Sequence, residues 1–296
     1  MNNDNILKYT IQENGKTVKG IMSENLNFSR RLSKKLELSD RIHINGRIAK
    51  LNKYVLTGDV LTIEFDEDED EYDAVDIPID IVYEDNDLLV VNKPPYIVVH
   101  PTKSHQNNTV ANGVAFYFKQ KNIKRKVRFV NRLDMNTSGI VIIAKHPYAH
   151  NELANQMKTN AVDKYYYAIV DGIINEDNGT INEPIARLNS EDIIRVVHPL
   201  GKECITHYNV EKRFNDMTLV KLKLETGRTH QIRVHLKHIG HPIIGDTLYG
   251  KESEQICRQA LHCYEMKFKQ PLSGEELLIS CPLPEDMEKI MGEKEK

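Results

Sequence analysis

One acid stands in a short polar stretch, NRLDMNTSG (residues 131–139), directly before the apolar run IVIIAK. Thr137, Ser138 and the permissive Gly139 favour a turn whose backbone is well fixed, so the carboxylate of Asp134 would be held on a loop and be available for chemistry. An isolated aspartate in such a place more often only caps a turn. The interpretation of Asp134 therefore depends on what the rest of the chain can bring near it.

A second stretch supplies a candidate partner for that carboxylate. In LETGRTHQIRVHLKHIGHPIIGDTLYG (residues 224–250), Gly227 ends a strand pattern, Thr229 is a candidate N-cap and Gly240 is a candidate helix stop. Arg228 would then stand at the corner between strand and helix. An arginine fixed at such a corner could bind a carboxylate through two N–H groups and keep it ionised.

The same stretch contains four histidines, which raises the question of a metal site. There is no HExxH motif, and no acid nearby is spaced to act as a further ligand. The apolar positions of the expected helix, Ile232, Leu236 and Ile239, share one face, and the histidines lie off that face. We therefore expect surface or RNA contacts rather than metal binding for His230, His235, His238 and His241.

A third stretch, DKYYYAIVDG (residues 163–172), reads as a strand rich in aromatic and β-branched residues. Alternation along a strand puts Tyr166 on one face and Tyr165 and Tyr167 on the other. One of these tyrosines could face a site, while the others would pack against neighbouring strands.

The elements that must position these residues form an α+β pattern. Helices are expected at residues 109–120, 147–158 and 229–239, and strands at 79–84, 87–92, 139–145, 164–170, 204–213, 218–225 and 277–281. Strands outnumber helices and do not alternate strictly with them. This favours a mixed, largely antiparallel sheet.

The first 65 residues read as a separate small unit. An amphipathic basic stretch with Phe28, Leu32 and Leu36 at helical spacing precedes RIHINGRI, in which Asn45 and Gly46 signal a tight hairpin. The acidic run DEDEDE then predicts a solvated linker over 66–76, followed by a second domain over 77–290.

The net charge of −3 hides two strongly basic blocks. Residues 29–53 contain eight Lys or Arg against two acids, and residues 119–132 contain seven and no acid. Although each block alone could be an ordinary solvated face, together they favour a polyanionic partner. The candidate RNA contacts are Arg30, Arg31, Lys34, Lys35, Arg47, Lys124, Arg125 and Lys126.

The composition excludes several other classes. With 296 residues, 40% of them hydrophobic, the chain can build a sizeable core, yet it has no long apolar run and its beginning, MNNDNILKYT, does not resemble a secretory signal. The four cysteines form no CxxC pair and are expected to be reduced, mostly buried thiols. We expect a cytoplasmic monomer with no membrane contact.

Taken together, the motifs resemble one enzyme family. NRLDMNTSGIVIIAK, the K-x-Y-x-A-x-V-x-G pattern in KYYYAIVDG, and GRTHQIRVHL followed by GHPIIGDTLYG are similar to the RluA family of pseudouridine synthases, with LLVVNKPPYIVVHP as the opening motif. The resemblance spans roughly residues 79–282. The stretch at 27–65 resembles the alpha-L RNA-binding domain shared with a small-subunit ribosomal protein (S4-like), and the whole chain is similar to the RluD-like branch, which modifies large-subunit ribosomal RNA.

The resemblance implies roles for individual residues. Asp134 matches the catalytic aspartate, Tyr166 the tyrosine beside the target base, and Arg228 the arginine paired with the aspartate. Arg132 would fill the space left by a flipped nucleotide, and Ile232 would pack under the uracil. Asn131 stands where the family more often has His, which puts only a secondary role in doubt. The implied reaction is an isomerisation that needs no cofactor and no metal.

Three alternatives stay open at this point. A glycosidase or nucleosidase also places an acid at a sugar carbon, but such enzymes usually need a second carboxylate, and none stands out in these motifs. A degenerate RNA-binding protein of the same fold would have lost Asp134 or Arg228, and both are present. Transfer RNA rather than ribosomal RNA could be the substrate.

Overall fold

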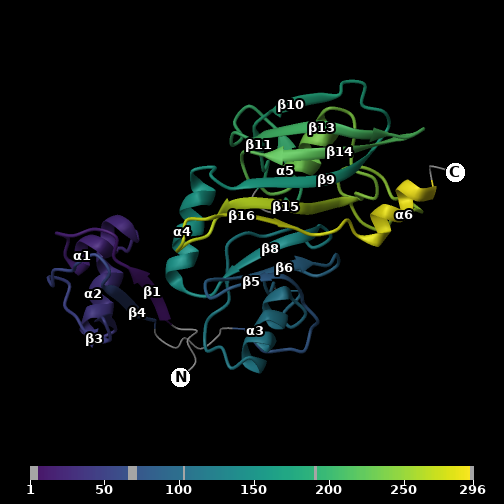
Figure 1. Cartoon of the computed structure of the whole chain (residues 1–296). Coiled ribbons are helices and arrows are strands. Elements are labelled where there is room, and N and C mark those ends of the chain that lie inside the picture. The colour runs from purple at the N-terminus through teal and green to yellow at the C-terminus, as the bar shows by residue number, and fades with distance from the viewer. Residues whose placement is uncertain (1–5, 66–71, 103, 190–191, 294–296) are drawn as a thin grey trace.

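The computed structural model describes residues 6–65, 72–102, 104–189 and 192–293. It contains two units, a small N-terminal one and a larger body that carries the remaining elements (Figure 1). Within the described residues, no helix combines the length and the apolar character that crossing a membrane requires.

The N-terminal unit contains the expected helix and hairpin. Helix α2 (Arg30–Leu38) begins at Ser29, whose side chain accepts a hydrogen bond from the Leu32 backbone N–H. Asn45 and Gly46 both have positive φ, which lets β2 and β3 join through a tight turn. The sheet order is β1-β4-β2-β3, with bounds β1 Ile6–Thr10, β2 Ile42–Ile44, β3 Arg47–Ile48 and β4 Val60–Glu64; α1 (Val18–Gly20) and a π-helical turn (Ile21–Asn25) complete the unit. Strand β1 lies outside the predicted helix and hairpin.

Aromatic rings join this unit to helix α4 (Pro147–Lys158) of the body. The ring of Phe28 stacks on Tyr148 with 5.0 Å between centroids, and the ring of Phe65 stacks on His146 at 4.8 Å. Asp87 Oδ1 lies 2.7 Å from His146 Nε2 and fixes the position of the imidazole. The two units therefore share a packed contact as well as a chain connection.

The boundary between the units differs in part from the expected one. Residues 66–71, which contain most of the predicted acidic linker, lie outside the described residues. Residues 72–76 already pack on the body, since the ring of Tyr72 lies against His100 and the Val75 N–H donates to the Asn112 carbonyl at 3.3 Å.

The body is built on one mixed sheet of ten strands. The order is β10-β13-β14-β9-β15-β8-β6-β5, with β16 on β15 and β7 on β8. Only the β15–β8 pair is parallel among the described pairs, so the expected mixed, largely antiparallel sheet is confirmed. The bounds are β5 Asp80–Glu84, β6 Leu88–Lys93, β7 Arg128–Phe129, β8 Ser138–Ala144, β9 Asp163–Asp171, β10 Asn178–Asn182, β13 Ile205–Arg213, β14 Met217–Leu224, β15 Leu261–Lys269 and β16 Glu276–Ser280.

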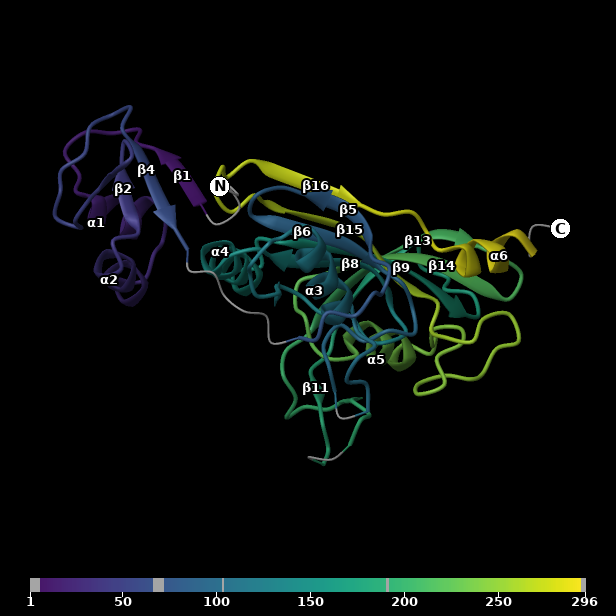
Figure 2. The same ribbon diagram turned by 90° about the horizontal axis from the view of Figure 1, so that it is seen from below.

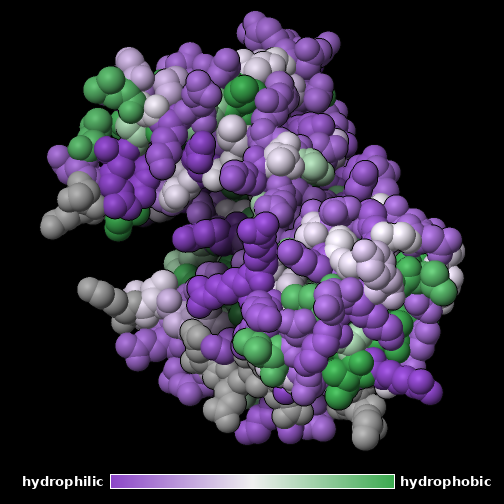
Figure 3. Space-filling view, turned by 90° about the vertical axis from the view of Figure 1, so that its left-hand side faces the viewer, coloured by the Kyte–Doolittle hydropathy of each residue, from purple (hydrophilic) through white to green (hydrophobic). Residues whose placement is uncertain are grey.

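Helices α3 (Val110–Gln120) and α5 (Gln231–His238) lie on one side of this sheet, together with the short hairpin of β11 (Ile185–Ala186) and β12 (Val196–Val197) (Figure 2). Helix α6 (Glu285–Glu293) lies near the C-terminal end. The space-filling view shows a hollow between an upper and a lower lobe, bordered mainly by hydrophilic residues (Figure 3).

The central strand β15 was not among the predicted strands. A bulge between Cys263 and Glu265 shifts its register against β9, and this shift breaks the strict alternation that marks a strand in a sequence. Beside it, Gly139 of β8 has φ +118, and a Cβ there would lie 2.2 Å from the Cys263 carbonyl oxygen. Only glycine allows β8 and β15 to meet this closely, five residues after Asp134.

Candidate active site

Asp134 lies on a turn that is fixed from two sides. The Thr137 N–H donates to the Asp134 carbonyl at 3.1 Å, which closes the turn. The buried ammonium of Lys93 donates to the carbonyls of Pro94, Ile97 and Met135 at 2.8, 2.9 and 2.8 Å. Burial, with a smaller contribution from nearby Arg258, lowers the pKa of Lys93 to about 7, and Asp134 opposes that shift. The sequence interpretation of the turn is confirmed, whereas the support from Lys93 was not foreseen.

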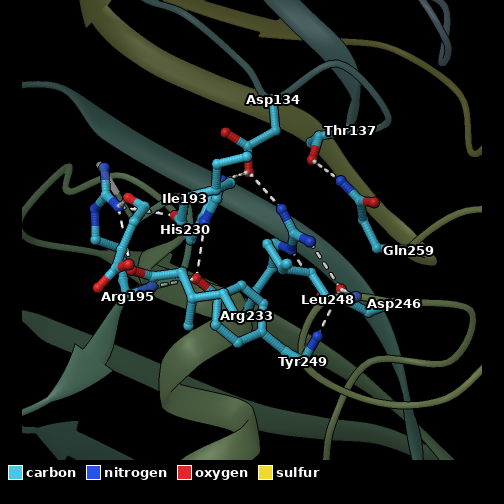
Figure 4. Close-up of polar contacts among 12 residues, drawn as sticks. Asp134, Thr137, Ile193, Arg195, His230, Arg233, Asp246, Leu248, Tyr249 and Gln259 are labelled. Carbon is cyan, nitrogen blue, oxygen red and sulfur yellow. Dashed lines mark hydrogen bonds and ion pairs between the residues drawn. The ribbon is translucent and has the colours of Figure 1, made fainter. Parts of the chain in front are cut away.

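The carboxylate of Asp134 is ion-paired with Arg233 of α5. A terminal guanidinium nitrogen lies 3.2 Å from Asp134 Oδ2, while the other N–H groups bind Asp246 at 2.7 Å each (Figure 4). Asp246 also accepts the backbone N–H groups of Leu248 and Tyr249. This network fixes the fork of Arg233, and the two carboxylates raise its pKa despite the opposing effect of burial, which is the largest single contribution.

The pairing expected for Arg228 is therefore wrong. Arg228 lines the pocket, but its side chain is directed to the neighbouring segment, where Nε donates to the Glu203 carbonyl at 3.5 Å. The reason is the start of α5. The predicted N-cap was Thr229, but the helix begins after His230, which has φ +58. The side chain of Gln231 accepts the backbone N–H of Arg228. With this starting point, the side of the helix that faces Asp134 carries Arg233.

His230 connects Asp134 to a neighbouring loop. Its Nε2 lies 3.7 Å from Asp134 Oδ2, and its Nδ1 lies 2.8 Å from the hydroxyl of Tyr249 (Figure 4). That hydroxyl accepts the backbone N–H of Arg195 at 2.8 Å. Burial is the main cause that lowers the pKa of His230, so its imidazole is neutral at pH 7.

Tyr166 of β9 lines the pocket; the strand alternation had separated it from Tyr165 and Tyr167, and the family resemblance had singled it out. Burial raises its pKa well above 10, so the phenol keeps its proton. Tyr165 and Tyr167 lie on the other face, where Tyr167 stacks on Tyr264 at 4.2 Å. The pocket holds about 80 Å³. Its lining residues are Arg132, Leu133, Asp134, Thr137, Tyr166, Leu224, Arg228, His230, Gln231, Ile232, Arg233 and Leu261.

The other predicted substrate contacts fall into two groups. Arg132 and Ile232 line the pocket, Arg132 exposed at its edge and Ile232 buried. Asn131 does not line it. Its side chain donates to the Ile140 carbonyl at 3.0 Å and accepts the Ile142 N–H at 2.8 Å, so it binds the backbone of β8 instead of facing the pocket.

The predicted RNA contacts are divided by burial. Arg30, Arg31, Lys34 and Lys35 are exposed on α2, and Arg47 is exposed on β3. In the second block, Lys124 is exposed and Lys126 half-buried, but Arg125 is only 4% exposed and donates to the Asn86 carbonyl at 3.2 Å. Arg125 therefore supports the body and is not a surface contact.

The chemistry of the pocket centres on one carboxylate. Among the described lining residues, Asp134 is the only acid; Asp246, the nearest other carboxylate of the network, is bound by Arg233 and buried. A hydrolase that uses two carboxylates would need a second acid facing the substrate. In the described ranges, no three His, Cys, Asp or Glu side chains are placed to hold a metal ion. The pocket thus offers a carboxylate beside a fixed guanidinium, a protonated phenol and an apolar floor.

Comparison with known proteins adds three findings. Residues 87–238 match the family model described as RNA pseudouridylate synthase. The chain is 42% identical over 253 residues to an uncharacterized RNA pseudouridine synthase of Bacillus subtilis, YjbO, covering 84% of this chain and 89% of that protein. It is 38% identical over 276 residues to ribosomal large subunit pseudouridine synthase D of Vibrio cholerae, covering 88% and 85%.

Solved structures agree with these sequence matches. Human RNA Pseudouridylate Synthase Domain Containing 1 superposes with a TM-score of 0.60 at 28% identity, covering 69% of this chain and 83% of that one. Human RNA Pseudouridylate Synthase Domain Containing 4 has a TM-score of 0.62 at 22% identity and shows the same fold.

Proposed function

The chain belongs to the RNA pseudouridylate synthase family, and from this premise we propose that it isomerises uridine in large-subunit ribosomal RNA, with Asp134 as the catalytic residue. The ion pair between Asp134 and the doubly anchored Arg233 carries the proposal, because it places a fixed cation 3.2 Å from the carboxylate that lines the pocket. The similarity to ribosomal large subunit synthases supports the choice of RNA. A substrate in ribosomal RNA would place the protein in the cytoplasm.

The reaction breaks the bond between ribose C1′ and N1 of uracil, rotates the base and joins C1′ to C5; C5 then loses its proton and N1 gains one, so the product is an isomer of uridine. The Asp134 carboxylate would either add to C1′ or promote a glycal intermediate. Both routes need an anionic Asp134, and Arg233 places a positive charge 3.2 Å from it. The target must first leave its stack, at a cost of about a few kcal/mol that basic contacts to the RNA backbone would offset.

The remaining pocket residues would hold the base during its rotation. Tyr166 keeps its phenol protonated, so it would pack against the uracil and donate or share a hydrogen bond rather than act as a free phenolate. Ile232 and Leu261 offer an apolar surface under the ring. Arg132, exposed at the edge, would occupy the space that the flipped uridine leaves in the RNA.

A direct test compares pseudouridine maps of ribosomal RNA from cells with and without this gene, and repeats the reaction in vitro with purified protein. We expect one or a few sites in large-subunit RNA to lose the modification, and the purified protein to restore it while Asp134→Asn does not. Unchanged maps in the deleted strain, together with no product in vitro, would reject the proposal. Loss confined to transfer RNA would reject only the ribosomal substrate.

A further inference from the structure

A second cavity adjoins the pocket of Asp134. It holds about 500 Å³ and is formed by the start of the β11–β12 hairpin, the turn at residues 200–202 and the loop at 227–229. Arg228 lines both this cavity and the catalytic pocket. The volume lies within the roughly 300–1,000 Å³ typical of sites for small organic groups.

The cavity is strongly cationic. Arg187, Arg195, Lys202 and Arg228 line it, and the described lining residues include no acid. In a chain with a net charge of −3, such a grouping is local and indicates an anionic ligand. Phosphate groups of RNA are the anions that this protein must meet beside its target uridine.

The walls of the cavity are held in place by backbone contacts. Ile185 and Lys202 exchange two backbone hydrogen bonds of 2.9 Å, which fix the turn against β11. A terminal nitrogen of Arg195 donates to the carbonyls of Asp192 and Ile193 at 2.8 Å each. The Arg195 guanidinium and the backbone that carries Lys202 are therefore held in place by the fold before any ligand binds.

Apolar side chains border the same cavity. Leu200 lines it and is 89% exposed, and Ile185 and Ala186 line it as well. A large apolar side chain exposed beside a cavity is available for contact with a ligand. An unpaired base, with its flat apolar faces and a charged phosphate attached, fits this combination of groups.

We infer that this cavity holds the nucleotide next to the target uridine, with its phosphate between Lys202 and Arg228 and its base against Leu200. The inference rests on the proposed function, which places the target uridine at Asp134. Arg228, at the border of the two cavities, would contact the phosphate that links the two nucleotides. The cavity would then select substrates in which both the target and its neighbour are unstacked.

The test uses the full chain and a large-subunit ribosomal RNA fragment in which the wild-type protein forms pseudouridine. The fragment is made with a single uncharged methylphosphonate linkage on one or the other side of the target. Lys202→Gln removes a charge of the cavity, and Arg187→Gln removes a second one from another wall. Lys267→Gln is the matched control, because Lys267 pairs with Glu276 on the face of the sheet opposite to Tyr166.

We expect Lys202→Gln to raise KM roughly tenfold with kcat within about twofold, and to lower the salt slope of binding by about one. An uncharged linkage on one side of the target should raise the KM of the wild-type protein by a similar factor. The same linkage should raise the KM of Lys202→Gln little further. Arg187→Gln should raise KM as Lys202→Gln does, and Lys267→Gln should have the KM and kcat of wild type.

The effects of Lys202→Gln and of the uncharged linkage on KM could instead multiply at both positions of the linkage, or Lys202→Gln and Arg187→Gln could have the same KM as Lys267→Gln. Either result would show that the cavity does not bind the neighbouring phosphate. A wild-type protein that forms no pseudouridine in any ribosomal fragment would reject the proposed function and this inference with it.

Discussion

Asp134 and Arg233 lie 99 positions apart in the chain and meet as an ion pair of 3.2 Å. The geometry of the pair depends on a third residue, since Asp246 holds two other N–H groups of the guanidinium at 2.7 Å. The arginine is therefore fixed before it meets the catalytic carboxylate, and little reorganisation is required when the RNA binds.

Replacing Asp134 by Asn should remove activity and leave the fold intact. The side chains are nearly the same size, but an amide can neither add to C1′ nor promote loss of the base as a carboxylate does. We expect turnover below roughly a thousandth of wild type, with unchanged RNA affinity and thermal unfolding. Asp177→Asn, an exposed aspartate paired with Arg213, is the control. Substantial turnover by Asp134→Asn would remove this residue from the mechanism.

The two arginines of the GRTHQIR motif should behave differently. Arg233→Ala leaves Asp246 buried without its cation, so the free energy of unfolding should fall by about 3–5 kcal/mol and activity should be lost. Arg233→Lys keeps the positive charge but loses the planar set of N–H groups that binds two carboxylates. It should therefore recover only part of the stability and part of the activity. Thermal unfolding and single-turnover rates, measured where each variant is folded, separate the two effects.

In contrast, Arg228→Lys should unfold like wild type and retain kcat, because Arg228 does not contact Asp134. Its effect should be confined to KM. A large loss of kcat in Arg228→Lys, with wild-type kcat in Arg233→Lys, would make Arg228 the arginine on which catalysis by Asp134 depends.

The hydroxyl of Tyr249 should matter for the position of His230. Tyr249→Phe removes the contact to His230 Nδ1 and the acceptor of the Arg195 N–H, both 2.8 Å, while the ring remains over Arg233. We expect kcat to fall by about tenfold, since the loss of one buried hydrogen-bonding group costs on the order of 1–3 kcal/mol. Binding of RNA at low salt should change little. Equal values of kcat for the variant and wild type would show that His230 is held by other contacts.

Lys93 should make stability rise with pH. Its pKa is about 7 in the folded protein and near 10.5 when unfolded, so the unfolded chain binds more protons between these values. The free energy of unfolding should therefore increase above pH 7, by at most about 1.4 kcal/mol per pH unit from this group. Lys93→Met should lack this contribution. Because Lys93→Met also leaves three carbonyls unpaired, the slope between pH 7 and 9 is the informative quantity, and equal slopes would contradict the shift.

Removing the N-terminal unit should weaken RNA binding more than chemistry. A chain starting at Tyr72 keeps the contact with His100 and all pocket residues, but loses the exposed cations of α2 and β3. We expect a higher KM, a flatter salt dependence and nearly unchanged turnover at saturation. Removal of the unit exposes the ring of Tyr148, which packs on Phe28 in the full chain, so Tyr148→Ser is added to the shortened chain to keep it soluble. Identical salt slopes with and without the unit would mean that its basic surface does not contact RNA.

The sequence predicted the elements with strong local signals. The Asn45–Gly46 turn, the strand that follows Asp134 and the alternation that separates Tyr166 from Tyr165 and Tyr167 all follow from patterns within ten residues. The choice between Arg228 and Arg233 could not be made in this way. It depends on where α5 begins, and the left-handed His230 shifts that start without any local signal of the usual capping kind.

Arg233 had one usable signal in the sequence, which is its position between two apolar residues, Ile232 and Val234. The structure shows that six consecutive residues of this helix are buried, and a buried arginine requires a carboxylate. Which carboxylates these are, Asp134 and Asp246, is decided by the long-range pairing of β8 with β15 and by the loop that follows α5. Such pairings leave no periodic trace in a single sequence.

The stacked rings of Phe28, Tyr148, Phe65 and His146 have a consequence for the choice of target. Helix α4 follows β8 within the same packed body, so the rings set a constant separation between the cations of α2 and the carboxylate of Asp134. A folded RNA could engage both only if its own helices present a phosphate groove and an unstacked uridine at that separation. We therefore expect base pairs inserted between the two contacts to raise KM about as much as removal of the N-terminal unit does, even with the local sequence around the uridine unchanged.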